Sequence, residues 1–116
     1  MTYDEHLADR IRRVLSEKKI HSAEKKMMGG LCFMVDDKML CGVNNNMLMA
    51  RVGKGAYEAS LRKPGCIKME FTGRSLKGFV HVKDEGIDME VDLEYWVDLC
   101  LRFNPLAKSS KKKKKK

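Results

Sequence analysis

Apolar positions follow two different patterns in the first half of the chain, and each pattern predicts a different kind of element. Over residues 4–18 they recur every three or four residues, which is typical of an amphipathic helix. Over residues 25–53 they form three short apolar runs, separated by Asp36-Asp37 and by Asn44-Asn45-Asn46. Runs of this length between Asp and Asn residues are typical of strands joined by hairpin turns. We therefore expect a helix followed by a three-stranded antiparallel meander.

In the second half of the chain we expect a short helix, two strands and a final helix. A short helix is expected over residues 56–62, where Pro64-Gly65 then turns the chain. Two strands follow, over residues 66–71 and 76–82, joined by a turn at residues 72–75. Periodicity thus predicts another pair of antiparallel strands beside the meander.

The clearest amphipathic stripe belongs to the last helix, which is expected to begin at Asp88. Its apolar positions recur at helical spacing and are Leu93, Trp96, Val97, Cys100 and Leu101. We expect Trp96 to be the large core residue that holds this helix against the sheet. The predicted fold is α+β, a single domain over residues 1–107 with the order α-β-β-β-α-β-β-α and an antiparallel sheet packed with helices.

Both faces of the predicted meander are apolar. Counting outward from the two turns pairs Val35 with Lys38, Cys32 with Cys41 and Val43 with Leu48. One face then carries Cys32, Met34, Met39, Cys41, Val43, Leu48, Ala50 and Val52, and the other carries Leu31, Phe33, Leu40, Met47, Met49 and Arg51. Either helices of the chain cover both faces, which we favour, or one face meets a protein partner or a second copy. Met47 and Met49 are candidates for such a contact surface, because flexible Met side chains adapt to partners.

Candidate reactive residues follow no known site pattern. The four cysteines contain no Cys-x-x-Cys, and the three histidines add no zinc spacing. The facing thiols of Cys32 and Cys41 are interpreted as small buried residues in a reducing cytosol. His81 is expected on a strand surface without a catalytic role. Gly29-Gly30 indicates a bulge or a close backbone approach; we favour the bulge over a phosphate loop, because no P-loop or Gly-x-Gly-x-x-Gly pattern follows.

Charge is distributed unevenly along the chain. The formal net charge is +8, yet residues 1–107 hold 17 basic and 16 acidic residues, and residues 84–107 hold seven acidic residues and one basic. Most of the excess lies in residues 108–116, which cannot bury apolar surface and are expected to be a disordered basic tail. Its lysines, Lys111, Lys112, Lys113, Lys114, Lys115 and Lys116, are either a nucleic-acid tether or an addition without such a role. The acidic N-terminus is no secretory signal and no membrane span is apparent, so a cytoplasmic location is expected.

Five segments of the chain, taken in order, are KKMMGGLCFMV, MLCGV, RVG before a short Ala-Tyr helix, FTGRSLKGFV and LEYWVDLCLRFN. Together they resemble the TfoX N-terminal domain family of TfoX/Sxy-like competence regulators. The resemblance runs from about Tyr3 to Pro105. Two departures preserve packing: Met28 stands where relatives typically have Phe, and Ser75-Leu76 replaces Pro-Met. The resemblance implies a compact α+β domain and kinship with regulators of natural DNA uptake and transcription.

Three classes of function remain to be compared. The resemblance favours a non-enzymatic regulatory or adaptor domain that acts on a protein partner, for example a transcription factor, or through self-association as a homodimer. The alternative is weak nucleic-acid binding through the lysine tail and the basic loop. No nucleotide loop, carboxylate pair, triad or metal set supports an enzyme, and we expect no catalytic residue, metal or cofactor. The candidate interaction surface on the loop consists of Gly73, Arg74, Lys77 and Gly78.

Overall fold

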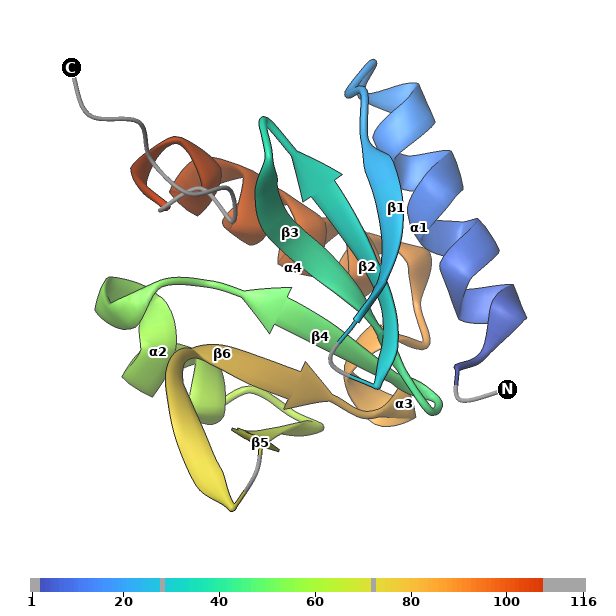
Figure 1. Cartoon of the computed structure of the whole chain (residues 1–116). Helices are drawn as coiled ribbons and strands as arrows, with labels where there is room; N and C mark the ends of the chain where they lie inside the picture. The colour runs from blue at the N-terminus through green and yellow to red at the C-terminus, as the bar shows by residue number, and fades with distance from the viewer. Residues whose placement is uncertain (1–2, 28, 72, 108–116) are drawn as a thin grey trace, which may run out of the picture.

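Six strands form one antiparallel sheet, in a computed structural model that describes residues 3–27, 29–71 and 73–107. The strand order across the sheet is β1-β2-β3-β4-β6-β5 (Figure 1). In chain order the elements are α1 (Glu5–Glu17), β1 (Ala23–Met27), β2 (Gly30–Val35), β3 (Lys38–Asn44), β4 (Met47–Arg51), α2 (Lys54–Leu61), β5 (Cys66–Phe71), β6 (Arg74–Val82), α3 (Asp84–Ile87), α4 (Glu90–Phe103) and the 3-10 turn η1 (Asn104–Leu106). The expected α+β class is confirmed.

Asp4 is the N-cap of helix α1. The Asp4 carboxylate accepts a hydrogen bond of 2.9 Å from the His6 backbone N–H, which satisfies one of the free donors of the first turn. The apolar stripe of the helix is buried and consists of Leu7, Ala8, Ile11, Val14 and Leu15. The 3.6-residue period therefore predicted this helix and its buried face correctly.

Helix α4 is held by the residue that its stripe predicted. Trp96 is 2% exposed, and its indole Nε1 donates a hydrogen bond of 3.2 Å to the Gly86 carbonyl. Gly86 belongs to α3, a short helix that the sequence did not reveal and that turns the chain from β6 into α4. A Cβ on Gly86 would lie 2.4 Å from the Pro64 carbonyl oxygen, so the chain passes here without room for a side chain.

Strand β1 is an addition to the predicted meander. Its residues are exposed except for the half-buried Met27, so it lacks the apolar alternation that marks a half-buried strand. It pairs with β2 through Met27 and Gly30 without a register shift, so the bulge expected at Gly29-Gly30 is absent. The other expectation for this pair, a close backbone approach, is observed, because a Cβ on Gly30 would lie 1.9 Å from the Val43 carbonyl oxygen.

A bulge occurs instead in the middle of the β2–β3 hairpin. Val35 pairs with Lys38 as predicted, but the register shifts between Phe33 and Met34. Cys32 therefore pairs with Gly42, and the predicted pairing of Cys32 with Cys41 is wrong. One extra residue in β3 moves every side chain beyond it to the opposite face of the hairpin relative to simple counting. The next hairpin is regular, and Val43 pairs with Leu48 as expected.

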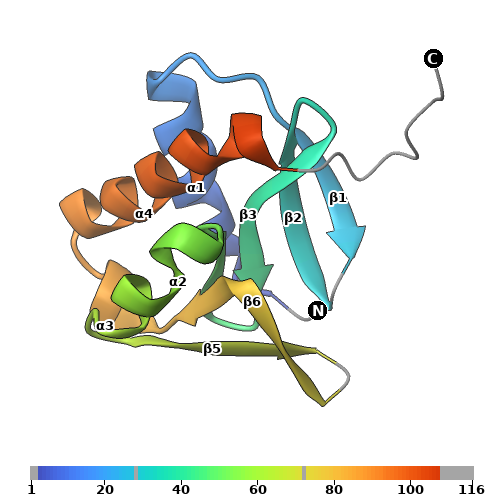
Figure 2. The ribbon, with the colours of Figure 1, turned by 90° about the vertical axis from the view of Figure 1, so that its left-hand side faces the viewer.

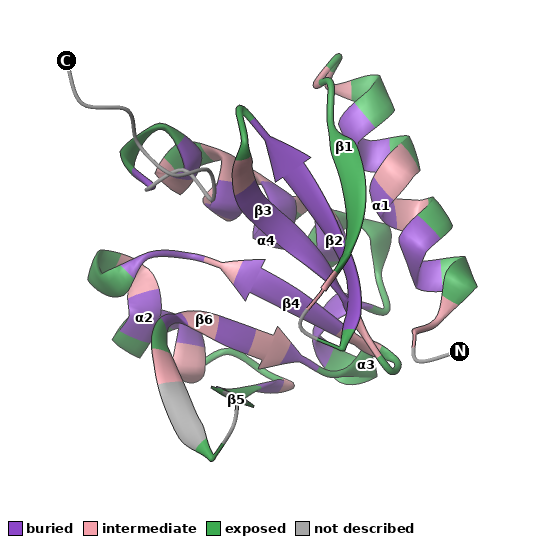
Figure 3. Ribbon diagram, in the orientation of Figure 1, coloured by how far each residue is buried: buried purple, intermediate pink, exposed green. Residues whose placement is uncertain are grey.

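The two sheet faces are consequently composed differently from the prediction. The helices gather on one side of the sheet (Figure 2), over a core that includes Leu31, Phe33, Leu40, Cys41, Val43, Leu48 and Ala50. The other face buries a sulfur-rich cluster of Cys32, Met34, Met39, Met49 and Met69, with Met27, Leu76 and Phe79 packed against it. Strands β2, β3 and β4 are buried over most of their length even though none of the helices in the described part of the chain covers this face (Figure 3).

The β5–β6 hairpin covers the helix-free face. It projects past β2 and β3 on the side away from the helices (Figure 2) and contributes Met69, Leu76 and Phe79 to the sulfur-rich cluster. Its register changes sharply, since Lys68 pairs with Val80 whereas Glu70 pairs with Ser75. The extra residues of β6 bend the hairpin there. The preference for helices on both faces was therefore wrong: the chain covers the second face with its own hairpin.

Candidate functional site

A groove of about 470 Å³ lies where β4, β6, the start of α2 and the end of α4 meet. Its lining consists of Arg51, Gly53, Lys54, Gly55, Lys77, Gly78, Phe79, Phe103, Leu106 and Ala107. These residues come from three separate parts of the sequence, 51–55, 77–79 and 103–107, so only the folded chain brings them together. The groove combines basic side chains with aromatic and aliphatic surface, which makes it the candidate site of the molecule.

The backbone of Gly78 holds the two halves of the groove together. Its carbonyl oxygen accepts hydrogen bonds from the Val52 N–H at 2.8 Å and from the Gly53 N–H at 3.0 Å. Gly78 has a φ of +94°, which residues with a Cβ rarely adopt, and it lies in the bulged part of β6. The bulge therefore sets the position of Lys77 relative to the start of α2.

Arg51 forms the buried end of the basic lining. Its guanidinium carbon lies 5.3 Å from the centre of the Phe79 ring and 5.8 Å from that of Phe103, and Nη1 donates a 3.4 Å hydrogen bond to the Met39 carbonyl. Burial lowers the pKa of Arg51. An arginine remains charged at neutral pH even so, because its ordinary pKa is above about 12. Arg51 thus carries a fixed positive charge between two aromatic rings.

Two further cations stand at the mouth of the groove. Lys54 and Lys77 are exposed, and no acidic side chain belongs to the described residues that line the groove. Leu106, at 77% exposure, adds apolar surface beside them. Exposed cations around an aromatic floor are suited to a ligand that carries both a carboxylate or phosphate and an apolar group.

The predicted interaction surface divides into three parts. Lys77 and Gly78 line the groove, whereas Gly73 is exposed at the tip of the β5–β6 hairpin, next to Arg74, which pairs with Phe71. Met49 is fully buried in the sulfur-rich cluster, and Met47 is half-buried where β4 begins, opposite Asn44. The six lysines from Lys111 to Lys116 lie outside the described residues.

Sequence reasoning missed most of the groove. Arg51, Lys54, Phe103 and Leu106 were not proposed as site residues. Arg51 ends an otherwise apolar strand, and Lys54 lies three residues later between Gly53 and Gly55. A lone cation at the end of a buried strand was the available signal. Phe103 and Leu106 gave none, because only the packing of α4 on the sheet brings them near Arg51.

No cysteine or histidine is among the described residues that line the groove. Burial raises the pKa of the Cys32 and Cys66 thiols to about 11 and that of Cys100 to about 12, and it raises the pKa of Cys41 well above its ordinary value. Within residues 3–27, 29–71 and 73–107, no group of three or more His, Cys, Asp or Glu side chains is placed to hold a metal ion. No helix in the same part of the chain has the length and apolarity needed to cross a membrane.

Comparison with known proteins identifies the family of this fold. The sequence profile of the TfoX N-terminal domain matches residues 20–104, which include every strand, all helices after α1 and every groove residue except Leu106 and Ala107. Searches of curated proteins and of solved structures gave no match. Since the profile covers well over half of the chain, this chain belongs to the TfoX N-terminal domain family.

Proposed function

We propose that this chain is a non-enzymatic regulatory or adaptor domain that binds a protein partner in the cytoplasm, with a transcription factor as one candidate. Membership of the TfoX N-terminal domain family supports a regulatory role of the kind that the resemblance implies. The observation that carries the proposal is the groove beside Arg51, which presents three cations around aromatic and aliphatic surface. The occupant is an acidic peptide segment of the partner that also carries apolar side chains.

The chemistry of the groove suits such a segment in two ways. Lys54 and Lys77 are exposed and can attract carboxylates before contact, which raises the rate of association. Phe79, Phe103 and Leu106 then offer surface on which an apolar side chain of the peptide can be buried. Arg51 is already held by its neighbours, so it loses little conformational entropy on binding.

Site-specific photo-crosslinking in cells tests this proposal. A photoreactive phenylalanine analogue replaces Leu106, which is 77% exposed at the groove, or Val91, which is 66% exposed at the start of α4. We expect the Leu106 probe to give a discrete protein adduct that is absent with the Val91 probe and lost when Lys77→Glu is added. The matched control is Glu58→Lys on the exposed surface of α2, which should leave the adduct intact. If the adduct of the Leu106 probe still formed after Lys77→Glu, this result would contradict a role for the groove.

Nucleic-acid binding is the second candidate function. Cations beside aromatic rings also suit a single strand, since phosphates pair with the cations and bases stack on the rings. Fluorescence anisotropy over a salt series separates the possible contributions, using the full chain, Lys77→Glu, and a chain with Lys111–Lys116 changed to glutamine. Six tail lysines on duplex DNA predict a slope of log affinity against log salt of up to about −5.

Comparison of the variants shows whether the lysine tail or the groove binds the nucleic acid. Binding that disappears with the tail substitutions and depends steeply on salt belongs to the lysine tail. Binding that persists at high salt and is lost with Lys77→Glu belongs to the groove, and would favour nucleic acid over a peptide as its occupant. No binding by the full chain would exclude this second function.

A further inference from the structure

Strand β5 is the last strand of the sheet, and no described strand pairs with its outer side. Among the described strands, β5 pairs with β6 alone, and it runs along the lower border of the molecule in Figure 2. A shallow hollow of about 650 Å³ lies beside β5 and is lined by Cys66, Ile67, Lys68 and Glu70 of β5, Leu61 of α2 and His81 of β6. An edge strand offers its outward N–H and C=O groups to any chain that can add another strand.

The opposite edge of the sheet, strand β1, has features that discourage the addition of another strand, and β5 lacks them. Strand β1 carries the adjacent lysines Lys25 and Lys26, and its Glu24 is bound by Arg12 of α1. Lysines at an edge discourage pairing between strands because they repel a second copy. In β5 the exposed charges are instead one of each sign, Lys68 and Glu70, with the buried Met69 between them. Ile67 adds apolar surface at 40% exposure.

The backbone of β5 sets which residues face outward. The Gly65 carbonyl accepts a hydrogen bond of 2.8 Å from the Lys83 N–H, so the backbone groups of Gly65 point towards β6. Successive residues of an antiparallel strand alternate between facing the neighbour and facing away. Lys68 and Glu70 therefore turn their backbone groups to the open edge. The N–H of Cys66 is already used, since it donates to the Lys63 carbonyl at 3.2 Å, which confines the free stretch to the charged part of the strand.

We propose that two copies of this chain associate by antiparallel pairing of their β5 edges, centred on Met69. In this register Lys68 of each copy stands opposite Glu70 of the other copy, so a two-fold axis produces two matched charge pairs. If the pairing were centred on residue 68 instead of Met69, Lys68 would stand opposite Lys68 of the other copy. If it were centred on residue 70, Glu70 would stand opposite Glu70. The charge pattern of β5 thus selects both the partner and the register.

This association goes beyond the proposed partner contact and uses different residues. None of the groove residues belongs to β5, so a dimer formed through β5 leaves both grooves available. Two six-stranded sheets would join into one continuous sheet, with the same face on the same side in both copies. The adaptor domain would then present two partner sites related by two-fold symmetry.

Sedimentation velocity of the full chain across a concentration series tests the proposal. We expect the apparent mass to rise with concentration from the 13.3 kDa of one chain towards twice that value. Lys68→Glu and Glu70→Lys each replace two attractive contacts by two repulsive ones, and each should raise the dissociation constant by at least about tenfold. Both side chains are exposed, so circular dichroism and thermal melting should show a folded domain.

Mixing the two variants provides the decisive measurement. Lys68→Glu carries two acidic residues at the edge and Glu70→Lys carries two basic ones, so an equimolar mixture should form a heterodimer that neither variant forms with itself. The control Glu58→Lys changes charge by the same amount on α2 and should dimerise like the unchanged chain. A chain that stays monomeric, single variants that dimerise normally, or a mixture that stays monomeric would each overturn the proposal.

Discussion

The ring of Phe103 lies directly against the backbone of Gly53. A Cβ built on Gly53 would be 2.4 Å from Cδ1 of Phe103 and 2.6 Å from Cε1, closer than real Cβ contacts come. Gly53 also has φ +88° and ψ 159°, a conformation that is almost confined to glycine. This contact joins the end of α4 to the start of α2, so the shape of the groove depends on the absence of a single side chain.

Gly53→Ala should therefore destabilise the domain and disturb the groove. The backbone conformation alone should cost about 1–3 kcal/mol, and displacement of the Phe103 ring adds to this. Alanine substitutions at Gly73 and Gly55 separate the cost of the backbone conformation from the cost of displacing the Phe103 ring. Gly73 has φ +79°, and beyond its chain neighbours no described atom lies within 4 Å of a built Cβ, whereas Gly55 has no positive φ and likewise no such close atom. Urea unfolding should rank Gly55→Ala as the mildest change and Gly53→Ala as the most damaging, and equal losses at Gly53 and Gly73 would show that the Phe103 contact is unimportant.

Local patterns predicted most elements of this fold, because α1 and α4 each bury one regular stripe and β2, β3 and β4 are short apolar runs between turn residues. The period of the last stripe identified Trp96 as a core residue, and the Asn turn placed Val43 opposite Leu48. Strand β1 escaped detection because its residues are nearly all exposed, which leaves no apolar alternation to find. Helix α3 is a single turn, too short for a period.

Sheet faces were predicted less well because a bulge has no strong sequence signal. One extra residue between the Val35–Lys38 pair and the Cys32–Gly42 pair exchanges the faces of half a hairpin. The candidate site shows a similar limit. Lys77 and Gly78 were identifiable from the basic loop, but Arg51 and Phe103 meet only after β4 and α4 have packed.

The bulge leads to a prediction about the cysteines. Cys32 belongs to the sulfur-rich cluster and Cys41 to the opposite core, so they should not form a disulfide under mild oxidation. Burial also raises the pKa of all four thiols, which keeps them protonated at pH 8. Ellman's reagent should modify native protein slowly and should modify all four thiols at once in denaturant.

Cys66 should be the first thiol to react, because it is 9% exposed and lies on the edge strand β5. Cys66→Ala should therefore remove the fastest phase of the native reaction, while Cys41→Ala should leave that phase unchanged. A rapid native reaction of the Cys41 thiol would contradict its placement in the core.

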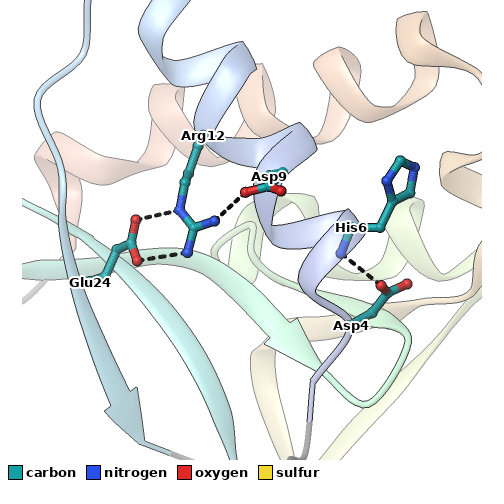
Figure 4. A network of polar contacts seen from close by, with 5 residues as sticks. All are labelled: Asp4, His6, Asp9, Arg12 and Glu24. Atoms are coloured by element: carbon teal, nitrogen blue, oxygen red, sulfur yellow. Dashed lines mark hydrogen bonds and ion pairs between the residues drawn. The ribbon is translucent and has the colours of Figure 1, made fainter.

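An ion pair fastens α1 to the edge strand β1. Arg12 donates two hydrogen bonds to the Glu24 carboxylate, from Nε at 2.7 Å and from Nη2 at 2.9 Å, and it also contacts Asp9 (Figure 4). Both paired side chains are more than a third exposed, so solvent screening limits the contribution to about 0.5 kcal/mol. Arg12→Lys keeps the charge but loses the two-pronged geometry, and it should therefore lose part of this stability.

The same ion pair should make the free energy of unfolding depend on pH in the acidic range. The hydrogen bonds from Arg12 lower the pKa of Glu24 below its ordinary value. A carboxylate with a lowered pKa in the folded chain stabilises fully above its unfolded pKa of about 4.3 and loses that contribution as pH falls through the folded pKa. Glu24→Gln should flatten the stability curve in this acidic range, whereas Glu17→Gln on the exposed end of α1 should not. Chemical denaturation at a series of pH values below 5 measures both.

His81 should make the domain less stable between neutral pH and mild acid. Its Nε2 is buried without a hydrogen-bond partner among the described residues, and burial lowers the pKa of the imidazole. The unfolded chain, with a pKa of about 6.5, therefore takes up a proton more readily, so the free energy of unfolding falls as pH drops below that value and levels off below the folded pKa. His81→Phe should remove this decline, because a ring that cannot take up a proton fills the same place. His6→Gln and His21→Gln alter exposed side chains and serve as controls. Thermal melts from pH 8 to pH 5 would contradict the interpretation if His81→Phe kept the full slope of the unchanged chain.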